Sequence, residues 1–171
     1  MNNEPSDATK PVAWGHPAIL LATCFWIGRL RPAPGTWGSA AALPFIAALS
    51  LAEVPFFIEV QLLLTLCCIG VPICTIASKQ LGGQKDPSSI VLDEFAAMPL
   101  VLLVVPAQQR TWLIMLLAFL LFRLFDIMKP PPCQQLEKLP NGAGIMADDL
   151  AAAGLAAGTL FVITTLMHTY Y

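Results

Sequence analysis

The sequence predicts an all-α fold, an integral membrane helical bundle whose polar motifs gather at one face of the membrane, the cytoplasmic face. Of the 171 residues, 57% are hydrophobic and only 12% are charged, and the mean hydropathy is +0.71. A soluble domain carries about 25% charged residues, so this chain has too few charges to cover a water-facing surface. Apolar runs also alternate with short polar stretches, which is typical of chains whose helices cross a bilayer.

Composition also limits the domain organisation and the partners. The length suggests one domain, residues 13–171, preceded by a disordered polar tail at 1–12. A net charge of −2, with no basic run carrying interleaved aromatic residues, excludes a nucleic-acid-binding surface. The odd number of cysteines, mostly inside apolar runs, favours helix packing over a disulfide framework. We therefore expect a lipid bilayer around the protein and predict no protein partner.

The predicted helices follow from the apolar runs in chain order. Residues 17–30 are apolar but short for a span of about 20 residues, so this segment can lie in the interface, re-enter or cross. A polar stretch follows and opens the next run, which is apolar apart from Glu53. The later runs are separated by the bend at 53–59, the loop at 78–89, the turn at 106–110 and the loop at 129–147. The predicted helices after the first cover residues 38–58, 60–77, 90–105, 111–128 and 150–167.

Residues 111–128 form the predicted central helix, and charged residues stand at its end. Arg123, Asp126 and Lys129 are spaced by three, so they are neighbours on one side of a helix. Charge at membrane depth is costly and marks a functional site by default. The simpler alternative is an ion pair of Asp126 with Arg123 or Lys129 inside the helix. Three prolines at 130–132 then end the helix.

The lengths of the connections predict where the polar stretches meet. The turn at 106–110 makes the helices on either side an antiparallel hairpin, so Asp93 and Glu94 come to lie beside Asp126. The runs 38–58 and 60–77 form a second hairpin, and Asp148 and Asp149 open the last helix on the same side. Most of the Lys and Arg residues lie at this face, so the positive-inside rule makes it cytoplasmic. The stretches that gather there are 34–39, 79–94, 123–129 and 148–149.

Carboxylates dominate this face and histidine is absent from it. Oxygen ligands without His or Cys suit Mg²⁺ rather than zinc. Like-charged carboxylates this close to lipid would repel one another unless a divalent cation lies between them. Acidic pairs at helix starts are also favoured by the helix dipole alone, which is the alternative explanation. The candidate metal ligands are Asp93, Glu94, Asp126, Asp148 and Asp149.

The stretch 34–39 adds a candidate phosphate site. It opens a helix, and the amide groups of a helix N-terminus attract anions. Its glycines free the backbone, and Thr36 and Ser39 could donate from their hydroxyl groups. An ordinary helix cap is the alternative. A Walker A loop is excluded because the Gly-Lys-Ser/Thr ending is missing.

Four stretches in this order, PGTWGS at 34–39, SIVLDEF at 89–95, FRLFDIMKP at 122–130 and GIMADD at 144–149, resemble the phosphatidylglycerophosphatase A family. The resemblance implies an all-helical, multi-pass Mg²⁺-dependent lipid phosphatase of the bacterial inner membrane. It implies a phospholipid substrate, phosphatidylglycerophosphate, converted to phosphatidylglycerol and inorganic phosphate. Leu92, the run Ala96-Ala97-Met98 and the triple proline depart from the family pattern. These departures bear on packing and lipid preference more than on the carboxylates.

The resulting mechanism assigns catalysis to Asp126, Glu94 and Asp149. One or two Mg²⁺ ions are held by some of the acidic ligands, and water or an aspartyl nucleophile attacks phosphorus. A divalent-cation transporter or channel using the same carboxylates is the alternative function. Gly154-x-x-x-Gly158 in the last run leaves a homodimer open. The expected substrate-binding residues are Gly35, Thr36, Gly38, Ser39, Arg123 and Lys129.

Overall fold

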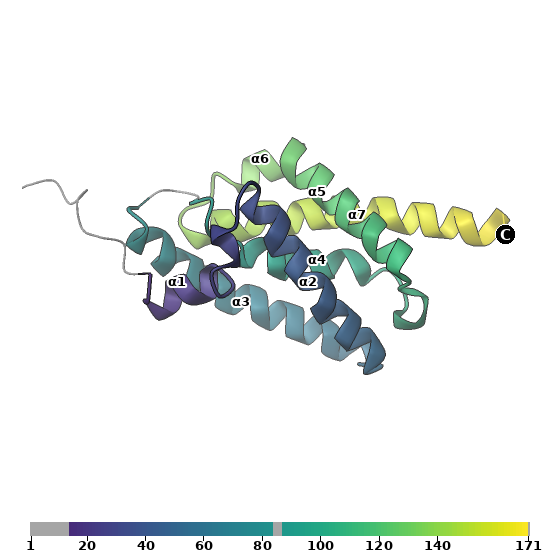
Figure 1. The fold of residues 1–171 in the computed structure, drawn as a ribbon. Helices are drawn as coiled ribbons and strands as arrows, with labels where there is room; N and C mark the ends of the chain where they lie inside the picture. The colour runs from purple at the N-terminus through teal and green to yellow at the C-terminus, as the bar shows by residue number, and fades with distance from the viewer. Residues whose placement is uncertain (1–13, 84–86, 171) are drawn as a thin grey trace, which may run out of the picture.

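The computed structural model describes residues 14–83 and 87–170, and all elements in these ranges are helical, as predicted (Figure 1). The predicted tail at 1–12 lies outside the described residues, as do Lys85 and Asp86 of the predicted loop. The elements are α1 (Pro17–Ala22), η2 (Ile27–Arg29), α2 (Pro34–Leu51), α3 (Phe56–Gln80), α4 (Leu92–Leu102), η3 (Ala107–Gln109), α5 (Trp112–Met128), α6 (Cys133–Leu136) and α7 (Gly142–Tyr170).

The helix at the centre of the fold is α4, not α5 as predicted. Helices α2, α3, α5 and α7 all pack against α4. Most residues of α4 are buried, among them Ala96, Ala97 and Met98, which departed from the family pattern. Their small or flexible side chains let neighbouring helices approach closely on every side. α5 instead keeps one apolar face outward and buries only Ala118 and Phe122 completely.

One predicted hairpin is confirmed and the other is not a packed pair. α4 and α5 are joined by a short connection containing η3 and pack against each other, as predicted. α2 and α3 are joined by a still shorter turn at 52–55, where Glu53 adopts a positive φ of 48°. In the described part of the chain, however, α2 packs chiefly on α4, and α3 on α7 and α1. A short connection therefore reverses the chain direction between these two helices, but it does not make them pack against each other.

The first apolar segment does not cross the membrane as one continuous helix. α1 ends after six residues, and Cys24, Phe25 and Trp26 then turn the chain with positive φ angles. The carbonyl of Ala22 accepts a hydrogen bond of 2.9 Å from the Val91 amide, just before α4. This segment therefore supports the loop that leads into the central helix.

The last helix begins at Gly142, six residues before Asp148, which was predicted to open it. Its first amide donates a 2.9 Å hydrogen bond to Thr75 Oγ1 on α3. This bond satisfies one of the amides that every helix start leaves unpaired. The prediction that Asp148 and Asp149 open the helix is wrong, because they lie in its second turn. Attraction to the helix start therefore does not explain this acidic pair.

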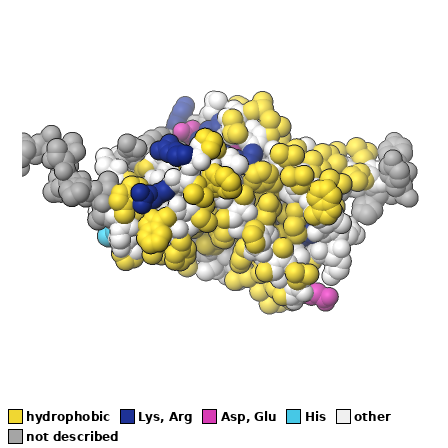
Figure 2. Space-filling model, in the orientation of Figure 1, with side chains coloured by type: hydrophobic (Ala, Val, Ile, Leu, Met, Phe, Trp, Pro, Cys, Tyr) yellow, Lys and Arg dark blue, Asp and Glu magenta, His cyan; other side chains and the backbone are white. Residues whose placement is uncertain are grey.

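Among the described residues, two helices are long and apolar enough to cross a membrane, α3 and the stretch Gly142–Met167 of α7. Only 22% and 28% of their most apolar windows are buried within the fold, whereas a core helix of a soluble protein is mostly buried. Figure 2 shows a mostly hydrophobic face on which the visible Lys and Arg side chains gather mainly toward the end that holds α1. These features support membrane association.

A buried ion pair fastens the other end of the bundle. Arg110, before α5, donates to both carboxylate oxygens of Glu59 on α3, at 2.8 and 2.7 Å, and both side chains are 4% exposed. Its guanidinium also donates to the Val105 carbonyl at 2.9 Å and to Ser50 Oγ on α2 at 3.3 Å. One arginine thus ties three segments together at the end opposite the predicted site.

Candidate active site

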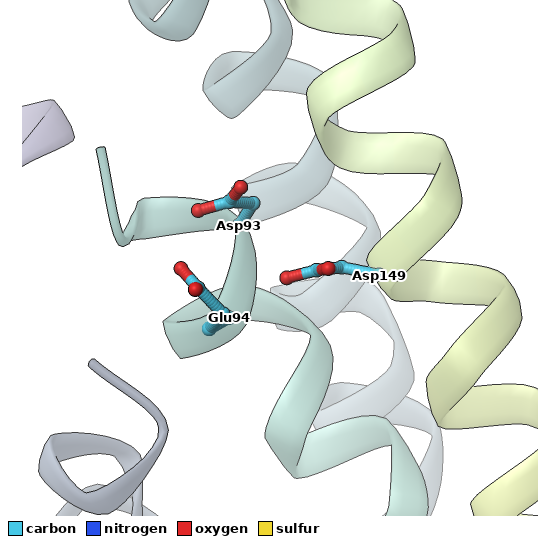
Figure 3. A group of neighbouring side chains, drawn as sticks. All are labelled: Asp93, Glu94 and Asp149. Carbon is cyan, nitrogen blue, oxygen red and sulfur yellow. The ribbon is translucent and has the colours of Figure 1, made fainter. Parts of the chain in front are cut away.

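Three carboxylates from two helices form the most tightly gathered acidic group. Asp93 and Glu94 project from the first turn of α4, and Asp149 reaches toward them from α7 (Figure 3). One oxygen from each lies within 4.8 Å of the others. Asp93 and Asp149 are buried, at 6% and 4% exposure. We call Asp93, Glu94 and Asp149 the acidic triad.

Arg123 joins the triad to the end of α5 and the start of α2. Its Nη1 atom lies 2.6 Å from Asp126 Oδ2, 3.8 Å from Glu94 Oε1 and 3.3 Å from Ser39 Oγ. The ion pair of Asp126 with Arg123, which the sequence left as the alternative to a functional role, is present within α5. It does not exclude a functional role, because the same guanidinium also faces Glu94. Arg123 Nε is buried without a hydrogen-bond partner among the described residues.

Lys129 occupies the second cationic position, at the C-terminal end of α5. Its Nζ atom lies 2.6 Å from Asp148 Oδ2 and 3.3 Å from Glu137 Oε2. Burial by itself would lower the pKa of Lys129, but the hydrogen bond and charge of Asp148, with Glu137 adding to them, raise its pKa above the usual range. Lys129 therefore carries its charge throughout the physiological range.

These pairings divide the five predicted metal ligands into two groups. Asp126 has a short ion pair with Arg123, and Asp148 has one with Lys129. Among the described residues, the ion pair of the triad is the longer contact of Glu94 to Arg123. Asp93 Oδ1, Glu94 Oε2 and Asp149 Oδ2 are buried and lack a hydrogen-bond partner among the described residues. Buried, uncompensated carboxylates are costly unless they coordinate a cation. Three converging hard oxygens fit Mg²⁺ in their chemistry.

The two glycines expected in the phosphate site allow close approach at the same place. A Cβ atom on Gly35 would overlap Glu94 Oε1, and one on Gly38 would overlap the side chain of Val91. Glycine therefore lets the first turn of α2 approach the start of α4. Thr36 lies on this same turn, and Ser39 donates to the Gly35 carbonyl at 2.9 Å. The candidate phosphate site at 34–39 is thus a helix start that packs directly against Glu94.

A cavity of about 280 Å³ lies between the residues just before α4, the first turn of α4, the end of α5 and the second turn of α7. Of the expected substrate-binding residues, Lys129 lines it, whereas Arg123 and residues 34–39 do not. A larger cavity, about 410 Å³, lies at the far end beside Glu59 and Arg110, whose charges neutralise each other, so it offers no comparable binding chemistry. The sequence did not single out two residues of this region. Glu137, a solitary acid in a polar loop, pairs with Lys129, and the apolar residue Ile127 lines the smaller cavity. The lining of the smaller cavity is Ser88, Ile90, Asp93, Glu94, Asp126, Ile127, Lys129, Asp148 and Asp149.

Comparison with known proteins identifies the family of the chain. Residues 20–164 match the family model described as phosphatidylglycerophosphatase A. The chain is 41% identical over 158 residues to the phosphatidylglycerophosphatase A of Haemophilus influenzae, covering 90% of this chain and 93% of the relative. It is 35% identical over 157 residues to the Escherichia coli protein of the same name, covering 91% and 88% of the two chains.

A third relative carries a different name. A putative phosphatidylinositol-3-phosphatase of Bacteroides thetaiotaomicron is 31% identical over 140 residues, covering 78% of this chain and 85% of the relative. No solved structure matches the chain. The relatives are named as phosphatases, so a transporter function has no support. With a match over most of its length and relatives above 30% identity, the chain is a phosphatase that belongs to the phosphatidylglycerophosphatase A family.

Proposed function

We propose that the protein is a Mg²⁺-dependent lipid phosphatase that converts phosphatidylglycerophosphate to phosphatidylglycerol and inorganic phosphate. The observation that carries the proposal is the buried acidic triad, whose oxygens converge and in which one oxygen of each carboxylate has no hydrogen-bond partner among the described residues. It lies beside Arg123 and Lys129 in a chain whose relatives share this activity in name. A terminal phosphate carries the charge that such a cation-and-carboxylate site is suited to bind.

Asp93, Glu94 and Asp149 would hold the ion. When bound, Mg²⁺ supplies a Lewis acid that neutralises phosphate charge. Arg123, which pairs with Asp126 and faces Glu94, would add positive charge beside the phosphate, and the start of α2 packs against Glu94. Lys129 stays charged beside Asp148 and adds positive potential to the cavity that it lines.

Asp126 lies at the cavity wall and accepts the proton of the attacking water. The new bond forms between the water oxygen and phosphorus, and the bond from phosphorus to the glycerol oxygen breaks. The proton ends on that glycerol oxygen. In the alternative route a carboxylate attacks phosphorus first and water then hydrolyses the acyl phosphate. Acid quenching of single turnovers with substrate that carries a ³²P-labelled terminal phosphate separates the routes, because only the second one links labelled phosphate covalently to a carboxylate of the protein.

The name of the Bacteroides relative favours a second candidate, a phosphatidylinositol 3-phosphate phosphatase. The same site chemistry serves either phosphomonoester, so substrate comparison decides. Phosphate release from the purified protein in detergent should be measured with phosphatidylglycerophosphate, phosphatidylinositol 3-phosphate and phosphatidic acid, each with Mg²⁺ and with EDTA. We expect release from phosphatidylglycerophosphate alone and its loss with EDTA. Preference for the inositol lipid, or undiminished release in EDTA, contradicts the proposal.

Asp149→Asn tests the triad. It should lower kcat by more than about 100-fold, since even residues that only support metal ligands contribute 10–100-fold. Mg²⁺ should raise the melting temperature of the native protein but not of this variant, because only a bound ligand stabilises the folded state. Glu53→Gln, on the turn after α2, is the matched control and should retain both properties. Normal Mg²⁺ stabilisation of Asp149→Asn would remove this residue from the metal site.

We further propose a multi-pass topology in the bacterial inner membrane with the active site facing the cytoplasm. Basic residues at the site end, Arg29, Arg31, Lys79, Arg123 and Lys129 among them, support it. Because α7 runs from that end to the opposite one (Figure 1), its C-terminus would lie in the periplasm. An alkaline phosphatase fused there should be active. An inactive but stable fusion would reverse the orientation.

A further inference from the structure

The outward face of α5 carries one continuous apolar stripe, formed by Leu113, Leu116, Leu120, Leu124 and Ile127. These residues recur every three or four positions, so they lie on one side of the helix. All five are exposed, and Ile127 is the most exposed of them at 71%. We call this set the α5 stripe.

The α5 stripe ends at the active-site cavity. Ile127 lines that cavity together with its neighbours Asp126 and Lys129. The other large apolar residue of the lining, Ile90, is only 3% exposed and belongs to the core. Ile127 is therefore the lining residue that also belongs to the outer apolar surface.

The outward faces of the other long helices do not reach the cavity in the same way. No residue of α3 lines it in the described part of the chain. On α7 the large exposed apolar residues begin at Phe161, about 18 Å along the helix from Asp149 at 1.5 Å per residue. Among these exposed helix faces, the α5 stripe is the one that continues into the cavity.

The length of the stripe fits a lipid chain. From Leu113 to Ile127 it extends about 21 Å along the helix, whereas one leaflet of a bilayer core is about 15 Å thick. We propose that the acyl chains of the lipid substrate lie along the α5 stripe and that Ile127 positions the phosphorylated headgroup at the cavity mouth. This inference rests on the proposed function as a lipid phosphatase, and it makes Ile127 a residue that selects lipid over water-soluble phosphomonoesters.

The contribution of Ile127 lies in shape and in the exclusion of water from the mouth. Lipid tails are as apolar as the stripe, so transfer from bulk lipid supplies no hydrophobic driving force. A branched side chain between the first acyl carbons and the carboxylates fixes where the chain bends toward the cavity. Ile127→Ser removes this volume and places a hydroxyl group there. Small changes of apolar shape in a site are worth about tenfold in discrimination.

The first experiment compares phosphatidylglycerophosphate with its deacylated form, which keeps the headgroup and lacks both chains. For Ile127→Ser we expect kcat/KM on the lipid to fall about tenfold relative to kcat/KM on the deacylated form. Leu64→Ser, at a comparably lipid-exposed site on α3, is the control and should leave that ratio within about twofold of the native value. An unchanged ratio for Ile127→Ser, or an equal fall for Leu64→Ser, overturns the proposal.

The second experiment needs no turnover. A phospholipid of the substrate class with a photoreactive group in one acyl chain is crosslinked to the native protein in EDTA, and the labelled peptides are mapped. We expect labelling to concentrate on α5, to fall when unlabelled substrate is added and to fall in Ile127→Ser. Equal labelling of α3, α5 and α7, insensitive to competitor, refutes the inference. If the native protein hydrolyses neither substrate, the proposed function fails. The labelling pattern still shows whether acyl chains of a phospholipid lie along the α5 stripe.

Discussion

Breaking the ion pair between Glu59 and Arg110 should destabilise the protein strongly without affecting its chemistry. In Arg110→Leu the Glu59 carboxylate loses both of its bonds to the guanidinium, at 2.8 and 2.7 Å, and is left buried and charged. Removing one partner of such a buried pair costs about 3–5 kcal/mol. Two charge-assisted hydrogen bonds at about 1.5–3 kcal/mol each give the same range.

The double variant Glu59→Leu with Arg110→Leu provides the internal control. It leaves no uncompensated charge, and apolar replacement of a buried pair is often neutral. We therefore expect the double variant to be more stable than Arg110→Leu alone. The free energies add only if the two residues do not interact, so the cycle measures the pair directly.

The assay is thermal unfolding in detergent, followed by far-ultraviolet circular dichroism. For a chain of this length 1 kcal/mol shifts the melting temperature by about 2–4 °C, so Arg110→Leu should melt roughly 6–20 °C lower. Its kcat at 20 °C, per folded molecule, should equal that of the native protein because the pair lies at the end opposite the acidic triad. A loss below about 1 kcal/mol, or a double variant as unstable as the sum of the singles, would refute this account.

Two further predictions concern the site itself. Gly35→Ala should lower kcat/KM about tenfold or more, because the new Cβ displaces Glu94 Oε1, while Gly154→Ala, with open space around it, should leave phosphate release unchanged. Lys129→Gln leaves the Asp148 carboxylate buried without its ammonium partner, so the free energy of unfolding should fall by about 1–3 kcal/mol. In the double variant Lys129→Gln with Asp148→Asn, the free energy of unfolding should recover but phosphate release should not. Equal recovery of both would show that this pair has only a structural role.

Part of this protein could be read directly from the residues. Low charge and long apolar runs predicted an all-helical chain, which the structure confirms, and membrane association, which the two long apolar helices support. The turn before α5 brought Asp93 and Glu94 to Asp126 because a short connection makes consecutive helices antiparallel. The order of the four motifs also pointed to the family, which the match over residues 20–164 confirmed.

Other features were decided only by tertiary contacts. The start of α7 depends on an amide bound to Thr75 of α3, a residue 67 positions away. The central place of α4 depends on which neighbours its small residues admit, and short-range periodicity carries no information about partners. The division of the acidic residues into paired and unpaired groups depends on distances between side chains of α4, α5 and α7. Sequence spacing reports neighbours along one helix, whereas the charge balance of a site is set between helices.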